Sequence, residues 1–161
     1  MINFLIISFY FFSFCLNSDL NKMRNLFPLI DKKESSAIAL FNISNNIIGI
    51  SQPLKNAYKA AAQMALAKYK FNPISKLTYF NEGKEKLNDC VLKDSVNIEI
   101  RYIRLAVQDH APSILNYQKN IIQDKKYILQ NIHSLIQKDP NLFLTITNYL
   151  RLNNHSIDLK K

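Results

Sequence analysis

The chain has 161 residues, of which 48% are hydrophobic and 20% are charged, values typical of a globular protein. A chain of this length can bury about 70% of the surface of its unfolded state, so a single domain can form without disulfides or a structural metal. It contains only two glycines and no tryptophan, which argues against turn-rich β folds and against a glycine-lined phosphate loop.

The formal net charge is +9, from 21 Lys and Arg against 12 Asp and Glu. Such basicity raises nucleic acid, anionic membranes and acidic proteins as partners. The basic residues are scattered, however, and only four are arginines, namely Arg24, Arg101, Arg104 and Arg151. The abundant Asn, Ile and Lys are also what AT-rich coding DNA would produce, and the excess charge favours solubility. Nucleic acid is therefore not expected as a partner.

The amino terminus is predicted to be an export signal. Residues 2–16, INFLIISFYFFSFCL, form an apolar run shorter than the about 20 residues of a membrane span, as in the apolar region of a signal peptide. Three alternatives stay open: an uncleaved membrane anchor, a lipoprotein modified at Cys15, and a buried N-terminal helix. After cleavage Cys90 is the single cysteine, which we interpret as a small buried apolar side chain.

Prolines divide the body of the chain into segments of helical length, and Asn72-Pro73 and Asp139-Pro140 each offer an N-cap followed by a first-turn proline. Residues 53–70 and 74–93 are predicted to be helices. The inner face of the first comprises Leu54, Ala57, Tyr58, Ala61, Ala62, Ala65, Leu66 and Tyr69, opposite Lys55, Lys59, Gln63 and Lys70. The inner face of the second comprises Ile74, Leu77, Phe80, Leu87, Cys90 and Val91, with Gly83 either permitting close packing or bending the helix.

The remaining segments are also predicted to be helical. Residues 20–50 fit one or two short helices ending near Asn46, because the β-branched run at 47–50 has no partner strand. Residues 113–137 repeat apolar pairs every seven residues, which fits packing on other helices or, alternatively, a coiled-coil dimer, with a break between Tyr117 and Asn120. Residues 140–152 place Leu142, Phe143, Ile146, Tyr149 and Leu150 on one face.

The segment 97–108, NIEIRYIRLAVQ, is the one helix whose polar residues need an explanation. Apolar residues cover most of its circumference, as in a central helix. Four of its five polar residues form a narrow polar stripe, which comprises Asn97, Arg101, Arg104 and Gln108, while Glu99 lies on the opposite side within the apolar arc. The polar stripe has three interpretations: the solvent edge of an inner helix, a strip in a groove that binds a carboxylate or phosphate, or an internal ion-pair network. Glu99 is expected in the first turn, with Asn97 as N-cap.

The sequence identifies no reaction. The three histidines, His110, His133 and His155, have no ligand partners at metal-binding spacing within their helices, so neither a metal nor a cofactor is expected. No nucleophile elbow, phosphate loop, dinucleotide fingerprint or paired-carboxylate motif occurs. His110 follows Asp109, and a helix C-terminal histidine that interacts with the helix dipole is the simplest interpretation.

Two resemblances add to these predictions. Residues 79–105, YFNEGKEKLNDCVLKDSVNIEIRYIRL, resemble part of a tetratricopeptide-type hairpin, with Asp94 and Asn97 at its turn and Cys90 at a usual small-residue position. More broadly, the order of an apolar leader, an AYKAAAQMALAK helix, an NIEIRYIRL helix and a DKKYI segment resembles small exported all-helical proteins of Bacteroidota bacteria, a group without an assigned role. The resemblance implies an exported compartment and no activity.

The prediction is an all-α protein of five or six helices packed as antiparallel hairpins. Residues 1–18 would be a signal peptide or anchor, 19–153 a single helical domain, and 154–161 a flexible polar tail. The expected function is an exported binding or scaffold module of the periplasm or envelope, whose partner is another envelope protein or an anionic ligand. Membrane contact is expected only through residues 2–16, if they are retained. The alternatives are an enzyme or enzyme inhibitor with a site around Arg101, Arg104 and His110, and a membrane-anchored complex subunit.

Overall fold

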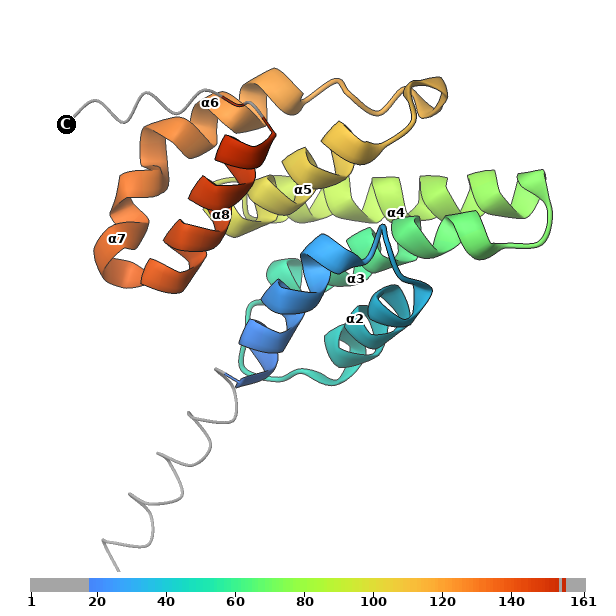
Figure 1. Cartoon of the computed structure of the whole chain (residues 1–161), viewed down its shortest axis with the longest axis horizontal. Coiled ribbons are helices and arrows are strands. Elements are labelled where there is room, and N and C mark those ends of the chain that lie inside the picture. Colours follow the sequence, from blue (N-terminus) through green and yellow to red (C-terminus); the bar gives the residue numbers. More distant parts are fainter. Residues whose placement is uncertain (1–17, 154, 156–161) are drawn as a thin grey trace, which may run out of the picture. The chain divides into compact units, whose positions relative to one another are not determined.

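The computed structural model describes residues 18–153 and residue 155 (Figure 1). The predicted leader and most of the predicted tail therefore lie outside the described residues. Residues 18–26 are helical, and no strand occurs in the part of the chain that is described. The α-helices are α2 (Glu34–Asn46), α3 (Gln52–Leu66), α4 (Pro73–Lys93), α5 (Ile98–His110), α6 (Ile121–Asn131), α7 (Leu135–Lys138) and α8 (Pro140–Leu152). Short 3-10 turns are η1 (Phe27–Leu29), η2 (Ala67–Tyr69), η3 (Ser113–Leu115) and η4 (Ile132–Ser134). The predicted all-α fold is confirmed, with somewhat more helices than the five or six expected.

The chain forms two compact units that meet between Lys93 and Asp94 in the sequence. The single helical domain over 19–153 stays a prediction. Periodicity shows which side of each helix is apolar, but it does not show which other helix covers that side, so the boundary between the two units is not visible in the pattern. Within residues 18–153, no helix has both the length and the hydropathy that crossing a bilayer requires.

In the first unit, the local signals for helix ends act as predicted. α2 ends at Asn46, and the β-branched residues after it form a loop in which Gly49 takes a positive φ of 81°. The Asn72 side chain caps α4, because its Oδ1 accepts the backbone N–H of Ser75 at 2.8 Å. Pro73 follows at the first helical position, where its missing N–H costs nothing.

The core of the first unit is the α3–α4 hairpin, whose two helices run side by side in Figure 1. Gly83 makes this close packing possible. A Cβ at Gly83 would lie 2.5 Å from Cγ of Met64 and 3.0 Å from the carbonyl oxygen of Ala60. Of the two roles predicted for Gly83, the structure therefore shows close packing. α2 packs on α3, and the Phe27 ring meets Tyr58 edge-on at 5.8 Å.

Four side chains of this hairpin lie where the periodicity did not place them. Gln63, predicted on the outer side of α3, is buried: its Nε2 donates to Glu82 Oε2 at 2.9 Å, and its Oε1 accepts from Lys86 at 3.0 Å. Tyr69, Ile74 and Leu77 were predicted on inner faces, yet they are exposed. Periodicity gives the direction of a side chain around the helix axis, but not how far along that axis a covering neighbour extends. Residues 68–78 are all exposed.

In the second unit, α6 packs on α5, and α7 packs on α8. The seven-residue repeat over 113–137 does not form one continuous helix, because η3 ends at Asn116, which has a positive φ of 47°. Ile128 and Leu135 are buried, whereas Ile114 and Ile122 are exposed. α8 buries Leu142, Ile146 and Leu150, as predicted, behind the N-cap of Asp139, whose Oδ1 accepts from Leu142 N at 3.1 Å.

Candidate functional site

Asn97, the first residue of the polar stripe, caps α5 as predicted. Its Oδ1 accepts the backbone N–H groups of Glu99 at 3.1 Å and Ile100 at 3.2 Å. Its Nδ2 donates to Asp94 Oδ2 at 2.9 Å, which fixes the turn before the helix. Glu99 lies in the first turn, where the helix dipole favours a carboxylate, and it is buried. The Asn97 side chain is thus committed to the first turn of its own helix and to the turn before it.

The two arginines of the polar stripe converge on Asp124 of α6. Arg101 Nη1 donates to Asp124 Oδ1 at 2.7 Å. Arg104 makes two bonds to the same carboxylate, from Nε to Oδ2 at 2.6 Å and from Nη2 to Oδ1 at 2.8 Å. The exposed fractions are 8% for Arg101, 6% for Arg104 and 0% for Asp124. These three residues form a buried ionic cluster, which we call the Arg–Asp–Arg cluster.

Further contacts hold Arg101 from the other side. Its Nε donates to the backbone carbonyl of Ser95 at 2.7 Å. Its guanidinium carbon lies 4.2 Å from the centre of the Tyr127 ring, within the range of a cation–π contact. The Tyr127 hydroxyl donates to the backbone carbonyl of Val96 at 3.1 Å. Arg101 therefore connects the turn before α5 to Asp124 and Tyr127, which lie about one turn apart on α6.

The geometry of the Arg–Asp–Arg cluster accounts for its burial. Charged groups lose hydration when they leave water, and this cost is offset only where ion pairs and hydrogen bonds have good geometry. The bidentate pair of Arg104 provides such geometry, because the guanidinium fork matches the carboxylate. Removal of one partner would leave an uncompensated buried charge, so the cluster is expected to hold α5 and α6 in one register.

Gln108, the last residue of the polar stripe, lies near Asn120 at the amino end of α6. Its Nε2 donates weakly to Asn120 Oδ1 at 3.4 Å. Its Oε1 is buried and has no hydrogen-bond partner among the described residues. An unpaired buried acceptor destabilises a fold by about 1–3 kcal/mol.

The four residues of the polar stripe thus serve three different local contacts. Only Arg101 and Arg104 share a partner, and that partner is a residue of the same unit. Of the three interpretations of the stripe, the internal ion-pair network describes the contacts of Arg101 and Arg104. Binding of an external anion by the stripe stays a prediction, and such an anion would have to compete with Asp124. The sequence pattern did not identify Asp124 as the partner of the two arginines. Asp124 lies in the first turn of α6 and is fully buried.

A second polar cluster lies at the carboxyl end of α5, and no sequence pattern predicts it. Asp109 Oδ2 accepts a hydrogen bond from the Tyr149 hydroxyl of α8 and another from His155 Nε2 at 2.7 Å. The backbone N–H of His155 also donates to the carbonyl of Leu150 at 3.0 Å. His155, assigned to a loose tail from the sequence, is therefore anchored. Residues 40 and 46 positions apart meet here, and no local pattern reports such a contact.

The tyrosines around this cluster are held neutral. Burial, followed by the hydrogen bond to Asp109, raises the pKa of Tyr149 well above its ordinary value of 10.0. Its ring meets Tyr102 edge-on at 5.2 Å, and burial also raises the pKa of Tyr102. A tyrosine with a raised pKa keeps its proton at neutral pH and is a weak acid, so the arrangement favours anchoring over proton transfer.

His110, part of the alternative enzymatic site, interacts with its own helix. Its Nδ1 lies 2.8 Å from the carbonyl oxygen of Ala106, one turn earlier. This contact agrees with the interpretation of a histidine at a helix carboxyl end. Among the described residues no three His, Cys, Asp or Glu side chains gather as a metal site requires. Cys90 is buried, as predicted, and burial raises the pKa of its thiol to about 11.

No protein-family model matches the chain, and neither a curated protein nor a solved structure matches it.

Proposed function

We propose that this chain is an exported, non-catalytic helical binding module that works in the periplasm or at the cell envelope. Export rests on the apolar run at residues 2–16, which lies outside the described residues. One structural observation carries the binding role. The consecutive exposed residues 68–78 include Phe71, Ile74 and Leu77, with exposed fractions of 101%, 80% and 50%. Neighbouring exposed apolar side chains mark a contact surface.

The two polar clusters of the second unit support a scaffold role more than a catalytic one. A substrate at Arg101 and Arg104 would have to displace Asp124, which holds both guanidinium groups at 2.6–2.8 Å. The Asp109 carboxylate is likewise engaged by Tyr149 and His155. The charged and polar groups of both clusters bond to other residues of the same unit. Such internal bonding suits a rigid support for a separate contact surface.

The proposal can be tested in the organism that encodes the chain. A photo-crosslinking amino acid replaces Phe71 in one variant and Ile114, which is 90% exposed, in a matched control. We expect the envelope fraction to hold a chain that lacks about 16–20 N-terminal residues, with an adduct that forms from position 71 and not from position 114. A full-length chain in the cytosol would contradict export. Equal adducts from both positions, or none, would contradict a binding surface at Phe71.

A further inference from the structure

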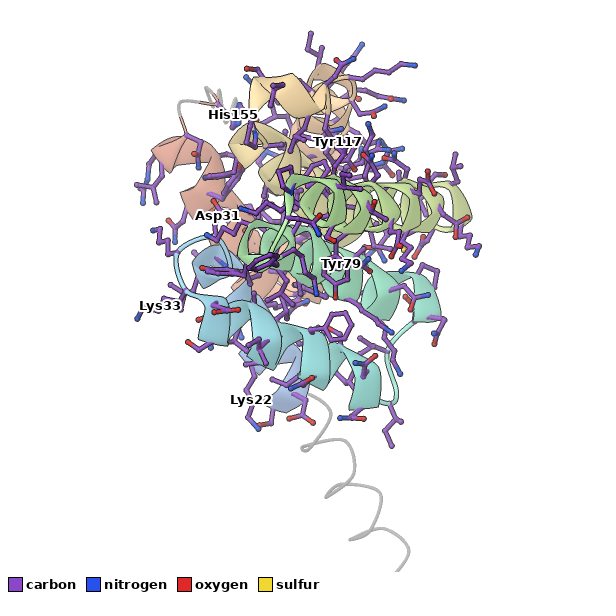
Figure 2. The ribbon with its side chains drawn as sticks, turned by 90° about the vertical axis from the view of Figure 1, so that its right-hand side faces the viewer. Lys22, Asp31, Lys33, Tyr79, Tyr117 and His155 are labelled. Atoms are coloured by element: carbon purple, nitrogen blue, oxygen red, sulfur yellow. The ribbon has the colours of Figure 1, made fainter. Side chains whose placement is uncertain are left out.

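We infer that the end of the α3–α4 hairpin, residues 68–79, docks on the surface of a phospholipid bilayer rich in anionic headgroups. We call this segment the hairpin tip. The inference rests on the binding role proposed above and names its partner. Figure 1 shows the hairpin tip as the turn between α3 and α4, and Figure 2 looks toward that end, with Tyr79 labelled.

The first observation is that the fold leaves the hairpin tip uncovered. α4 begins at Pro73, but its first buried residue is Phe80, so nearly two turns of helix extend beyond the packed part of the hairpin. Ile74 and Leu77 are one turn apart and share a face of these turns. Phe71, which precedes the capping residue Asn72, is fully exposed. Exposure of these side chains is unfavourable in water, and the cost is relieved by an apolar environment such as the acyl boundary of a bilayer.

The second observation is the charge of this region. No Asp or Glu occurs between Glu34 and Glu82, while the same stretch contains Lys55, Lys59, Lys68, Lys70 and Lys76. Lys68 donates to the backbone carbonyl of Asp31 at the base of the hairpin tip. Lys70 and Lys76 are exposed beside the apolar side chains. A surface that combines apolar residues with lysines, and has no carboxylate in its own segment, complements an anionic lipid surface.

The third observation is a depression beside the exposed helix turns. It has a volume of about 330 Å³ and is lined by Lys70, Ile74, Ser75, Thr78 and Tyr79. The Lys70 ammonium lies 4.0 Å from the centre of the Tyr79 ring, a cation–π contact that keeps the charge at this place. The Lys70 ammonium and the hydroxyl groups of Ser75, Thr78 and Tyr79 offer hydrogen-bond donors for a phosphate oxygen. The depression thus suits the phosphate of a lipid headgroup. In this arrangement Phe71 and Ile74 enter the acyl boundary beneath the headgroups.

Because the chain contains no tryptophan, the fluorescence of one introduced tryptophan reports on its own position. Phe71→Trp in the full chain gives a single fluorophore at the hairpin tip, and Ile114→Trp gives a matched control at a side chain that is 90% exposed. Both variants keep residues 1–17, so any binding by that segment is common to them. Each is titrated with vesicles of phosphatidylglycerol and phosphatidylcholine in equal parts, and with vesicles of phosphatidylcholine alone. Brominated lipids report whether the fluorophore enters the bilayer.

We expect a blue shift and bromine quenching for Phe71→Trp on the anionic vesicles, little response on the neutral vesicles, and none for Ile114→Trp. The double change Lys70→Gln, Lys76→Gln in the Phe71→Trp chain should weaken binding about tenfold or more, because each lysine near an anionic surface contributes to attraction. Added salt at about 0.5 M should weaken it as well.

Three results would overturn the inference. The first is no response on anionic vesicles, and the second is an equal response from both fluorophores. The third is a blue shift without vesicles that grows with protein concentration, which would identify a second copy of the chain as the occupant. A crosslink from position 71 to an envelope protein, together with silent vesicles, would refute the lipid partner and retain the binding module. Silent vesicles with no crosslink would refute both.

Discussion

The α3–α4 hairpin and the α5–α6 pair each hold two helices together, but with different chemistry. In the hairpin, small residues let the helices approach until Gly83 faces Met64 and the carbonyl of Ala60. In the α5–α6 pair, two arginines bind one buried aspartate. Close apolar packing is disturbed by a change of side-chain volume, whereas a buried ionic cluster is disturbed by the loss of one charged partner. The difference predicts which substitutions each pair can accept.

The largest effect is expected for Asp124→Ala. This change leaves two buried guanidinium groups without their carboxylate, so we expect the free energy of unfolding to fall by about 3–5 kcal/mol. Urea denaturation followed by circular dichroism measures the loss. A loss below about 1 kcal/mol, the range of exposed ion pairs, would contradict a buried ionic cluster.

A compensated variant separates the missing charge from the lost contact. The triple change Arg101→Met, Arg104→Met, Asp124→Leu replaces the Arg–Asp–Arg cluster with apolar side chains, and it should recover most of the stability that Asp124→Ala loses.

The double change Arg101→Ala, Arg104→Ala should destabilise the chain. If it instead left stability unchanged and abolished partner capture, the polar stripe would be a binding site.

An intermediate effect is expected for Gly83→Val in the α3–α4 hairpin. The added side chain must displace Met64, and its Cβ would lie 3.0 Å from the Ala60 carbonyl oxygen, which belongs to the backbone and cannot easily move. Overpacking of this kind lowers the free energy of unfolding by about 1–3 kcal/mol. Thr78→Val, at an exposed position of the same helix, should stay within about 0.5 kcal/mol. Valine has a higher helix propensity than glycine, so propensity alone would not lower stability. A Gly83→Val chain as stable as the Thr78→Val chain would contradict the close approach.

The smallest effect concerns alkaline pH. The pKa of the buried Cys90 thiol is raised from 9.0 to about 11 in the folded chain. The unfolded chain therefore loses this proton first, so stability is complete below pH 9 and falls as the pH rises through about 11. Denaturation at several pH values should show a smaller decline over that interval for Cys90→Ala than for the unchanged chain. Identical declines would show that the thiol is already ionised or is accessible in the folded state.

The sequence by itself determined the helical class, most helix ends and most inner faces. The caps at Asn72, Asn97 and Asp139 are local devices, because each side chain bonds to backbone two or three residues onward. Most of the predicted inner residues of α4 are buried for an equally local reason: they recur with the period of the helix. These features need no knowledge of the partner helix.

The tertiary structure decided what the polar and the uncovered apolar residues do. Asp124 lies 20 residues from Arg104, and His155 lies 46 residues from Asp109, so neither cluster leaves a periodic trace. The exposure of Ile74 and Leu77 depends on where the covering part of the hairpin ends, which a helical pattern does not encode. Local sequence fixes the direction of each side chain, whereas contacts between distant segments fix whether that direction leads to a partner, to a charge or to solvent.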